Sequence, residues 1–464
     1  MNRIFFALPA ILLAGCALGP DYQRPSLDLP PPSPAAGLVA APAAALPWWS
    51  VYQDPALDKL IAEALAHNTD LSIAAARVTE AEAQFGITRA DQFPSLYATA
   101  GRVRSRASQD APNFQPGIPL ESTSNKAAVN ISFDLDFWGK YRRATEAARA
   151  DLMAVEANRD AVRLALESGV AQGYIALLAL DAQLSISQLA LLRAKEQFEM
   201  QKVRFDAGVS SEFEFRQREA EYDAARAQLP PVEAARAKQE RALAILLGRS
   251  PRAIIGDKIE RAGTLSAPQL PAGMPSELLL NRPDVRKAEQ ELIAANARIG
   301  VARAAYFPSI SLTGFLGSES TALHNLFSGP ARTWRFAGDL TEPLWGAGRL
   351  NSQADIANAR NEQAVQVYRA AVANAFREVA DALAEHAKAR EVAEAEAKRV
   401  ASLTKAWKLA ILRYDQGVSS QLDVIDTERG LLQGEFDRIA AERDLRLSVA
   451  DLYHALGGKA APGN

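Results

Sequence analysis

The sequence predicts a mainly α-helical chain that also carries a few β-strands suited to a membrane. Three observations lead to this prediction. Residues 129–137, VNISFDLDF, alternate strictly between apolar and polar side chains, as in a strand with one apolar and one wet face. An Ala- and Arg-rich run without proline follows over residues 141–205, which favours a very long helix. The same landmarks then recur in the same order in the second half of the chain.

The composition excludes several classes of protein. Among 464 residues, Lys and Arg number 52 and Asp and Glu 55, for a formal net charge of −3. No nucleic-acid partner is expected, because such proteins normally carry a basic excess. No apolar stretch after residue 15 has the length expected of a transmembrane helix, so any membrane segment should consist of strands. P-loop, GxSxG, HExxH and CxxC motifs are absent, so we expect no enzyme activity, no cofactor and no metal site.

Residues 1–15 have the pattern of a lipoprotein signal peptide. Arg3 precedes an apolar segment too short to span a bilayer, and Leu13-Ala14-Gly15-Cys16 resembles a bacterial lipobox. Cys16, the only cysteine, is therefore the predicted lipidation site, and Ala at position 17 favours sorting to the outer membrane. The alternative is an ordinary secretory signal with a chance cysteine. Residues 16–56, rich in Pro and Ala, are expected to form a lipidated, extended N-terminal tether.

An internal duplication organises the rest of the chain. The segment FDAGVSSEFEF at 205–215 matches YDQGVSSQLDV at 414–424, an offset of 209 residues. QFPSL at 92–96 matches YFPSI at 306–310, and FWG at 137–139 matches LWG at 344–346. Repeats of this kind indicate one structural unit present twice. We predict a first repeat over residues 57–262 and a second over residues 263–464.

Each repeat predicts the same elements in the same order. A first helix, 57–90 or 276–305, stops before Phe-Pro, because proline disfavours a helical conformation in the residue before it. Two strands follow, and a very long helix then runs to a Gly-Val-Ser-Ser turn, from which a further helix returns. The expected strands are 95–106, 129–137, 309–317 and 334–345, and the loop of the first pair covers 107–124. All four reach the length of about 9–11 residues that a membrane strand needs.

The long helices carry a seven-residue pattern, which marks packing against neighbouring helices as in coiled coils. At 1.5 Å per residue, the run 141–205 would be about 100 Å long, too long for one globular core to cover. It is therefore expected to line something elongated. The stripe and its counterparts 209 residues later are Val170, Leu177, Leu184, Leu191, Phe198 and Phe205, and Val379, His386, Ala393, Val400, Trp407 and Tyr414.

Four strands are too few to enclose a pore, and an open sheet in lipid would leave its edges unpaired at several kcal/mol per group. Several chains are therefore expected to contribute four strands each to a shared barrel. Alternating residues would then face lipid and a water-filled lumen. The alternative is a small soluble sheet half-buried on a helical domain. The predicted lipid-facing residues are Val129, Ile131, Phe133, Leu135 and Phe137, and the predicted lumen-facing residues are Asn130, Ser132, Asp134 and Asp136.

The sequence resembles the TolC-like outer membrane efflux protein family, in the lipoprotein (NodT-like) branch that serves RND-type pumps. Four segments carry the resemblance and span nearly the whole mature chain. They are CALGPDYQRP at 16–25, WWSVYQDPALDKLIAEAL at 48–65, QLPPVEA at 228–234, and NRPDVRKAEQELIAANARIGVARAAYFPSISLTG at 281–314.

The resemblance implies a homotrimer in the cell outer membrane, whose twelve-stranded barrel continues into a long α-helical periplasmic tunnel. It also implies the function of an exit duct that docks with a periplasmic adaptor (membrane fusion) protein and an inner-membrane RND-type pump. Such a duct passes small molecules such as drugs or metal ions to the exterior. Two alternatives are the duct of a type I secretion system and a periplasmic coiled-coil scaffold without a channel.

The resemblance further places functional residues at the two Gly-Val-Ser-Ser turns. A capping role is the alternative for Asp423 and Glu214, since each follows a serine at capping-box spacing, and a solvated carboxylate is the alternative for Asp426. For the residues of the implied adaptor-docking surface, the alternative is a purely structural role in the turn. His386, on the seven-residue stripe, is expected to be a packing histidine. The implied periplasmic gate comprises Tyr414, Leu422, Asp423, Asp426, Arg429 and Glu214. The implied adaptor-docking surface comprises Gly208, Val209, Ser210, Gly417, Val418 and Ser419.

Overall fold

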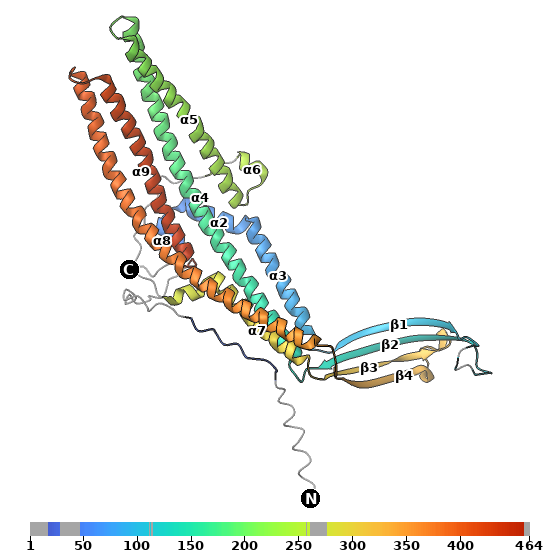
Figure 1. Ribbon diagram of the computed structural model, residues 1–464. Coiled ribbons are helices and arrows are strands. Elements are labelled where there is room, and N and C mark those ends of the chain that lie inside the picture. The colour runs from blue at the N-terminus through green and yellow to red at the C-terminus, as the bar shows by residue number, and fades with distance from the viewer. Residues whose placement is uncertain are drawn as a thin grey trace. The chain divides into compact units, whose positions relative to one another are not determined.

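The computed structural model describes residues 17–27, 47–110, 112, 115–256, 258–259 and 276–458. Cys16 and the predicted signal peptide lie outside these residues. The chain divides into two compact units (Figure 1). Neither unit coincides with a predicted repeat, because the long helices of both repeats continue from one unit into the other. Unit 1 comprises Met1–Leu27, Val78–Glu156 and Lys287–Arg369, and unit 2 comprises Asp28–Arg77, Ala157–Arg286 and Ala370–Asn464.

The order of elements agrees with the predicted duplication. The long helices α4 and α8 have 67 residues each, and the return helices α5 and α9 have 35 each. The first half contains η2 (Trp48–Tyr52), α2 (Pro55–His67), α3 (Thr69–Ala90), β1 (Ser95–Arg106), β2 (Glu121–Leu135), α4 (Lys140–Asp206), α5 (Glu212–Leu246) and α6 (Pro251–Gly256). The second contains η3 (Ser276–Asn281), α7 (Pro283–Ala304), β3 (Ser309–Ser320), η4 (Leu323–Asn325), η5 (Gly329–Ala331), β4 (Arg332–Thr341), α8 (Arg349–Asp415) and α9 (Gln421–Ala455).

The first helix of each repeat is shorter than predicted. In the first repeat, Asn68 interrupts the expected helix and separates α2 from α3. Its side-chain oxygen accepts the Leu71 N–H at 3.0 Å, and its amide donates to the Leu246 carbonyl at 2.9 Å. In the second repeat, α7 begins only at Pro283, where proline is favoured because it lacks an N–H that the first turn could not use. Both boundaries depend on caps that the apolar pattern does not show.

Three strands also differ from the prediction. β2 begins at Glu121 instead of residue 129 and ends at Leu135, while β3 extends to Ser320 and β4 covers Arg332–Thr341. The assignment of Phe137 to a lipid-facing strand is therefore wrong, because Phe137 lies in the turn after β2. Asp136 ends the strand because its carboxylate accepts the backbone N–H groups of residues 141 and 142, at 3.1 and 2.9 Å, and so caps α4.

The four strands form one antiparallel sheet in the order β1-β2-β3-β4. Ile131 on β2 lies opposite Leu96 and Gly314, and Gly314 lies opposite Phe336. Because opposed residues share a face, the alternation seen in β2 extends across all four strands. We call the apolar side the apolar band. Its members are Leu96, Ala98, Ala100, Ala127, Val129, Ile131, Phe133, Leu135, Ile310, Leu312, Gly314, Leu316, Trp334, Phe336, Gly338 and Leu340.

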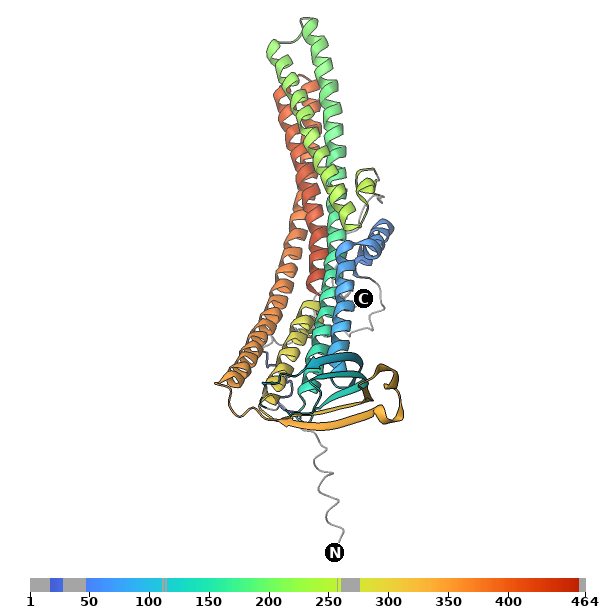
Figure 2. The same cartoon turned by 90° about the vertical axis from the view of Figure 1, so that its right-hand side faces the viewer.

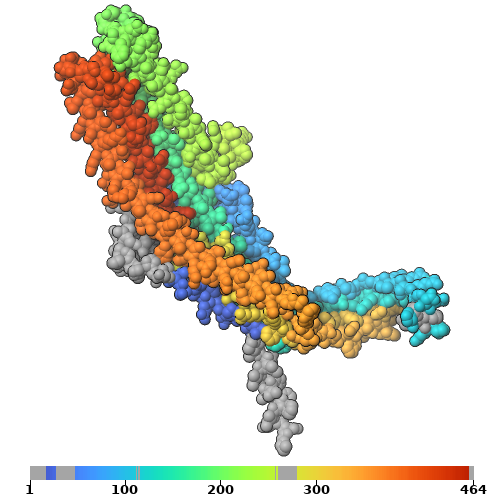
Figure 3. Space-filling view, in the orientation of Figure 1, coloured from blue at the N-terminus to red at the C-terminus, as the bar shows by residue number. Residues whose placement is uncertain are grey.

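The apolar band is exposed. Leu96, Leu316, Trp334 and Phe336 keep 69%, 66%, 68% and 69% of their surfaces accessible. Within unit 1 the helices meet the sheet at one end only, and the visible face of the sheet carries no helix (Figures 1 and 3). A sheet half-buried on a helical domain would cover this face, so the soluble alternative does not match the structure. The opposite face is mainly polar and includes Thr99, Asn130, Ser132, Asp134, Ser311, Thr313, Arg335 and Asp339.

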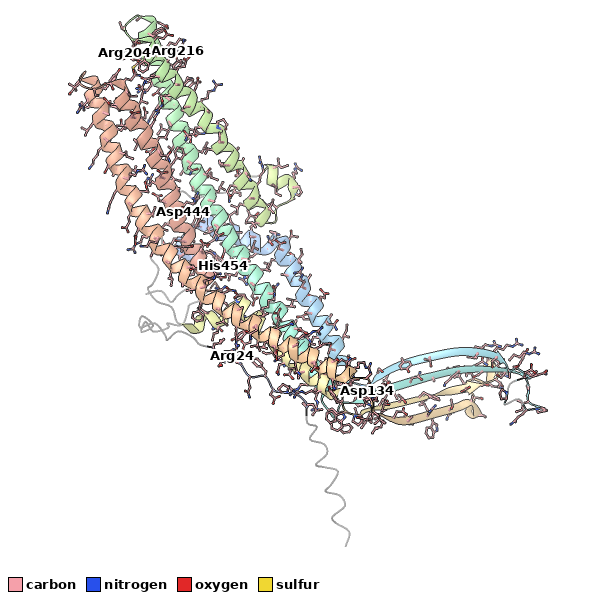
Figure 4. All side chains as sticks on the ribbon, in the orientation of Figure 1. Arg24, Asp134, Arg204, Arg216, Asp444 and His454 are labelled. Atoms are coloured by element: carbon pink, nitrogen blue, oxygen red, sulfur yellow. The ribbon has the colours of Figure 1, made fainter. Side chains whose placement is uncertain are left out.

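Residues 17–27, part of the expected extended tether, make contacts with the helices that the sequence analysis did not predict. In unit 1, Arg24 donates two hydrogen bonds to the Glu289 carboxylate of α7, at 2.7 and 2.9 Å. Arg143 of α4 forms an ion pair with Asp21 at 2.7 Å. This segment is therefore fastened to the helices next to the sheet, and Figure 4 labels Arg24 there. Composition predicted only its extended backbone.

In unit 2 the seven-residue stripe is packed as predicted. Val170 and Leu177 are fully buried, and no residue of either stripe is exposed. The main core joins η2, α2, α4, α5 and α9. Its buried members include Trp48, Tyr52, Leu57, Leu60, Ile61, Leu166, Val170, Tyr174, Ile175, Leu177, Leu243, Leu247, Ile259, Val449 and Tyr453.

One expectation about membrane helices is wrong. Helix α4 contains an 18-residue window of mean hydropathy 1.7, so its length and composition would suffice to cross a membrane. The sequence analysis expected no apolar stretch of this length after residue 15. One such window also occurs in helices of soluble proteins, so it is weak evidence for a membrane span.

Candidate functional site

The candidate site lies at the ends of two helical hairpins of unit 2, formed by α4 with α5 and by α8 with α9. Figures 1 and 2 show these hairpins side by side with both turns at the same end. Gly208 and Gly417 have φ values of +71° and +73°, in the left-handed region that favours glycine. The N–H groups of Val209 and Val418 donate to carbonyls five residues earlier, at 3.0 and 2.9 Å. Both long helices thus end in Schellman motifs, as the glycines predicted.

Capping boxes open both return helices. Ser211 accepts the Glu214 N–H at 3.3 Å, and the Glu214 carboxylate accepts the Ser211 N–H at 3.1 Å. Ser420 and Asp423 make the equivalent bonds at 3.4 and 3.0 Å. The capping role of Glu214 and Asp423 is therefore present in the structure. Asp423 remains exposed, so its carboxylate faces solvent while it caps the helix.

Asp426 lies one turn further along α9, beyond the cap. Its side chain is exposed, and the described part of the chain provides it with no hydrogen bond or ion pair. Leu422 lies on the first turn of the same helix and is 46% exposed. In the single chain, the first turns of α9 thus expose one carboxylate without a hydrogen bond or ion pair and one apolar side chain.

Polar contacts join the two hairpins near their tips. The guanidinium of Arg204, labelled in Figure 4, donates to the Tyr414 hydroxyl at 3.4 Å. Arg429 of α9 donates to the Glu221 carboxylate of α5 through Nε at 3.2 Å and through a second bond from Nη2. Two of the predicted gate residues, Tyr414 and Arg429, therefore form contacts between the two hairpins.

A third contact is buried. The Arg218 side chain on α5 is 6% exposed, and its guanidinium lies 3.9 Å from the Glu428 carboxylate on α9. Burial lowers the pKa of Arg218 and raises the pKa of Glu428, in each case against the charged form. Desolvation is thus the largest influence on both pKa values, and a buried ion pair of this kind is weak evidence for added stability.

Sequence reasoning missed Arg204, Arg218, Glu221 and Glu428. A usable signal existed in the duplication. At the offset of 209 residues, Arg218 corresponds to Thr427 and Glu221 corresponds to Gly430, so the two copies differ in charge at these positions. Such differences in charge mark positions at which the two copies make different contacts.

The turn residues form the outermost part of each hairpin. Val209 and Val418 are 67% and 62% exposed, and both follow a glycine in the left-handed conformation. Ser210 and Ser419 are half-buried beneath them. Each tip therefore presents one exposed valine on a tight turn.

No metal centre occurs among the described residues, where no group of three His, Cys, Asp or Glu side chains converges. His386 packs between helices, with Nδ1 2.9 Å from the Ser448 hydroxyl. Burial, with a smaller contribution from the Arg390 charge, lowers the pKa of His386. It has the environment of a packing histidine.

Comparisons with known proteins agree with this architecture. The family described as "Outer membrane efflux protein" matches residues 60–249 and 274–458, one segment within each predicted repeat. The "Cation efflux system protein CusC" of Escherichia coli K12 is 34% identical over 456 residues, covering 97% of both chains. The "Solvent efflux pump outer membrane protein SrpC" of Pseudomonas putida is 35% identical over 463 residues, covering 98% of this chain and 97% of SrpC.

A solved structure extends the comparison to the fold. The Campylobacter jejuni CmeC outer membrane channel superposes with a TM-score of 0.90 at 26% identity, covering 97% of this chain and 96% of CmeC. The paired helical hairpins and the exposed four-stranded sheet thus define an outer membrane channel of efflux pumps. The chain belongs to the outer membrane efflux protein family, whose members are channels and not enzymes.

Proposed function

We propose that three copies of this chain close a twelve-stranded barrel in the outer membrane, which continues into a helical periplasmic tunnel. The observation that carries the proposal is the open four-stranded sheet with an exposed apolar band on one face. β1 and β4 are its edges, and unpaired edge groups in lipid would cost several kcal/mol each. Pairing β4 of one copy with β1 of the next removes every edge.

In this barrel the apolar band faces lipid, and Val129, Ile131, Phe133 and Leu135 lie on it. The opposite face lines the lumen. That lumen face carries charges of both signs, including Asp134, Arg335 and Asp339. Mixed charges suit a duct that passes varied solutes, because a ring of one sign would favour ions of the other.

The exported compounds are small molecules delivered by an inner-membrane RND-type pump through a periplasmic adaptor. The names of the relatives indicate two chemical classes, cations for CusC and organic solvents for SrpC. The mixed lumen surface supports either class, so we place selection in the pump. The lipobox favours the pump branch over a type I secretion duct, and the exposed apolar band argues against a scaffold without a channel.

The adaptor is proposed to dock on the hairpin tips, at Gly208, Val209, Ser210, Gly417, Val418 and Ser419. Exposed Val209 and Val418 supply apolar contacts, and the left-handed glycines before them allow the tight turns that present them. Lipidation at Cys16 is also proposed, on the lipobox motif. Fatty-acid labelling that persists in Cys16→Ser would contradict it.

The trimeric channel has a direct test. In gel electrophoresis, full-length protein extracted from outer membranes should migrate as a trimer without heating and shift to the monomer position on heating. The same protein should conduct ions in planar bilayers. A heat-stable barrel is expected because every strand is paired. A monomer without conductance would refute the proposal and favour the scaffold.

Asp426→Asn is expected to weaken cation selectivity of the channel in planar bilayers. Threefold symmetry would bring three unpaired Asp426 carboxylates around one axis, and a carboxylate ring attracts cations. Asp423→Asn is the matched control, because Asn keeps a capping oxygen near the helix N-terminus. It should change selectivity less, since the Asp423 carboxylate is already bonded within its cap. Wild-type selectivity in Asp426→Asn would leave Asp426 as a plain solvated residue.

A further inference from the structure

The apolar band ends abruptly toward the loops of the sheet. On β1, the row Leu96, Ala98 and Ala100 continues on the same face as Arg102, Arg104 and Arg106. On β4, Arg332 occupies this face opposite Ser318, level with Ala127 at the end of the band. We call Arg102, Arg104, Arg106 and Arg332 the arginine ledge. Beyond the apolar band, this face thus carries arginines on β1 and β4 and polar residues such as Asn125 and Ser318 on β2 and β3.

The arginine ledge carries excess positive charge. All four of its side chains are exposed. Glu121 is the only acidic residue that the strand register places on this face, and it pairs with Arg104 at 2.6 Å and with Arg106 at 3.8 Å. Two of the four guanidinium groups therefore share one carboxylate, and the strand register places no other carboxylate on this face for Arg102 and Arg332.

The opposite face of the sheet at this level has no comparable excess of positive charge. The strand register places Lys126 opposite Glu319 there, so one cation is matched by one anion, and the Lys126 ammonium lies over the Phe315 ring, 3.9 Å from its centroid. Ser124 also donates to the Glu319 carboxylate at 2.7 Å. The charge excess is thus confined to the face that carries the apolar band.

We propose that the arginine ledge binds the phosphate groups of an anionic lipid in the outer leaflet of the outer membrane. This inference rests on the proposed barrel, in which the apolar band faces lipid. The helices of unit 1 join the sheet at its other end, so the loops and the ledge lie on the external side (Figure 1). A lipid that lays its acyl chains on the band brings its headgroup to the ledge.

The residue type fits a phosphate ligand. The planar guanidinium donates two parallel hydrogen bonds to phosphate, and it is less strongly hydrated than an ammonium group. The ledge consists of arginine only. A freely dissolved phosphate could accept the same hydrogen bonds but would make no contact with the adjoining apolar band. A lipid would use both features, so we assign the ligand to the lipid.

The test uses full-length protein purified from outer membranes and delipidated in detergent. Bisphosphorylated lipid A is added as the probe, and retained lipid is measured by native mass spectrometry. The triple variant Arg102→Gln, Arg104→Gln, Arg106→Gln is expected to retain at least about tenfold less lipid A than wild type, since each basic side chain near a charged lipid surface adds to binding. Arg335→Gln, on the opposite face of β4, is the control and should retain the wild-type amount.

Two further measurements distinguish binding of a lipid from binding of a free anion. Dephosphorylated lipid A should be retained poorly by wild type, and millimolar inorganic phosphate should compete only weakly with lipid A. Equal retention by wild type and the triple variant would overturn the inference. Complete displacement of lipid A by inorganic phosphate would also overturn it, in favour of a simple anion site.

Heat-dependent mobility and bilayer conductance are measured on the same samples. A wild-type protein that fails both would refute the barrel itself. Intact trimers and conductance with unchanged lipid retention would refute only the lipid site. A triple variant with wild-type mobility has folded, so its loss of lipid A would be due to the ledge.

Discussion

Arginine in place of Ile131 is expected to destabilise the folded channel by about 2–4 kcal/mol, the cost of a basic side chain on the lipid face near the bilayer midplane. Ile131 lies at the middle of the apolar band on β2, opposite Leu96 and Gly314. Its replacement should lower the urea concentration at which the trimer in lipid vesicles loses its heat-dependent mobility. The export function should fall with the amount of folded trimer.

The matched control is Ser132→Arg, one residue further along the same strand. Ser132 lies opposite Ser95 and Thr313, on the face assigned to the lumen. Arginine there should leave the unfolding midpoint nearly unchanged and alter single-channel conductance. An equal loss of stability in both variants would show that the two faces of the sheet are wrongly assigned.

Trp48→Ala is expected to lower the free energy of unfolding of unit 2 by about 3–5 kcal/mol, as large-to-small changes of buried aromatic residues do. Trp48 is 1% exposed and stacks on Tyr453 of α9, with ring centroids 5.5 Å apart. Its indole N–H donates to the Glu167 carboxylate of α4 at 3.3 Å. The substitution therefore leaves a cavity and removes one of the two hydrogen bonds to the Glu167 carboxylate, which keeps its bond from Arg163 at 2.9 Å.

Circular dichroism during denaturant unfolding would measure this effect without relying on tryptophan fluorescence. Trp49→Ala is the control, because Trp49 is only partly buried and packs against the edge of the core. Its cost should be clearly smaller. Trp48→Phe keeps the aromatic stack and loses only the hydrogen bond, so it should fall between the two. Equal midpoints for both alanine variants would show that Trp48 does not anchor the core.

Much of the architecture was predictable because its signals are local. The alternation over residues 129–135 identified the apolar face of β2, and left-handed glycines with capping serines identified both hairpin tips. The seven-residue stripe identified the packed sides of α4 and α8. Phe137 was misassigned because a single capping carboxylate, Asp136, outweighed the continuing alternation.

The sequence by itself determined the class of protein, the duplication, and the residues at the hairpin turns, because periodicity and caps are properties of neighbouring residues. Only the tertiary structure decided which residues meet across the chain. The Arg429–Glu221 contact joins residues 208 positions apart, and residues 17–27 fasten to α4 and α7 through Arg143 and Glu289. The arginine ledge also required the strand register. Such pairings depend on how distant segments pack, and the sequence of one strand or helix does not specify where its partner lies.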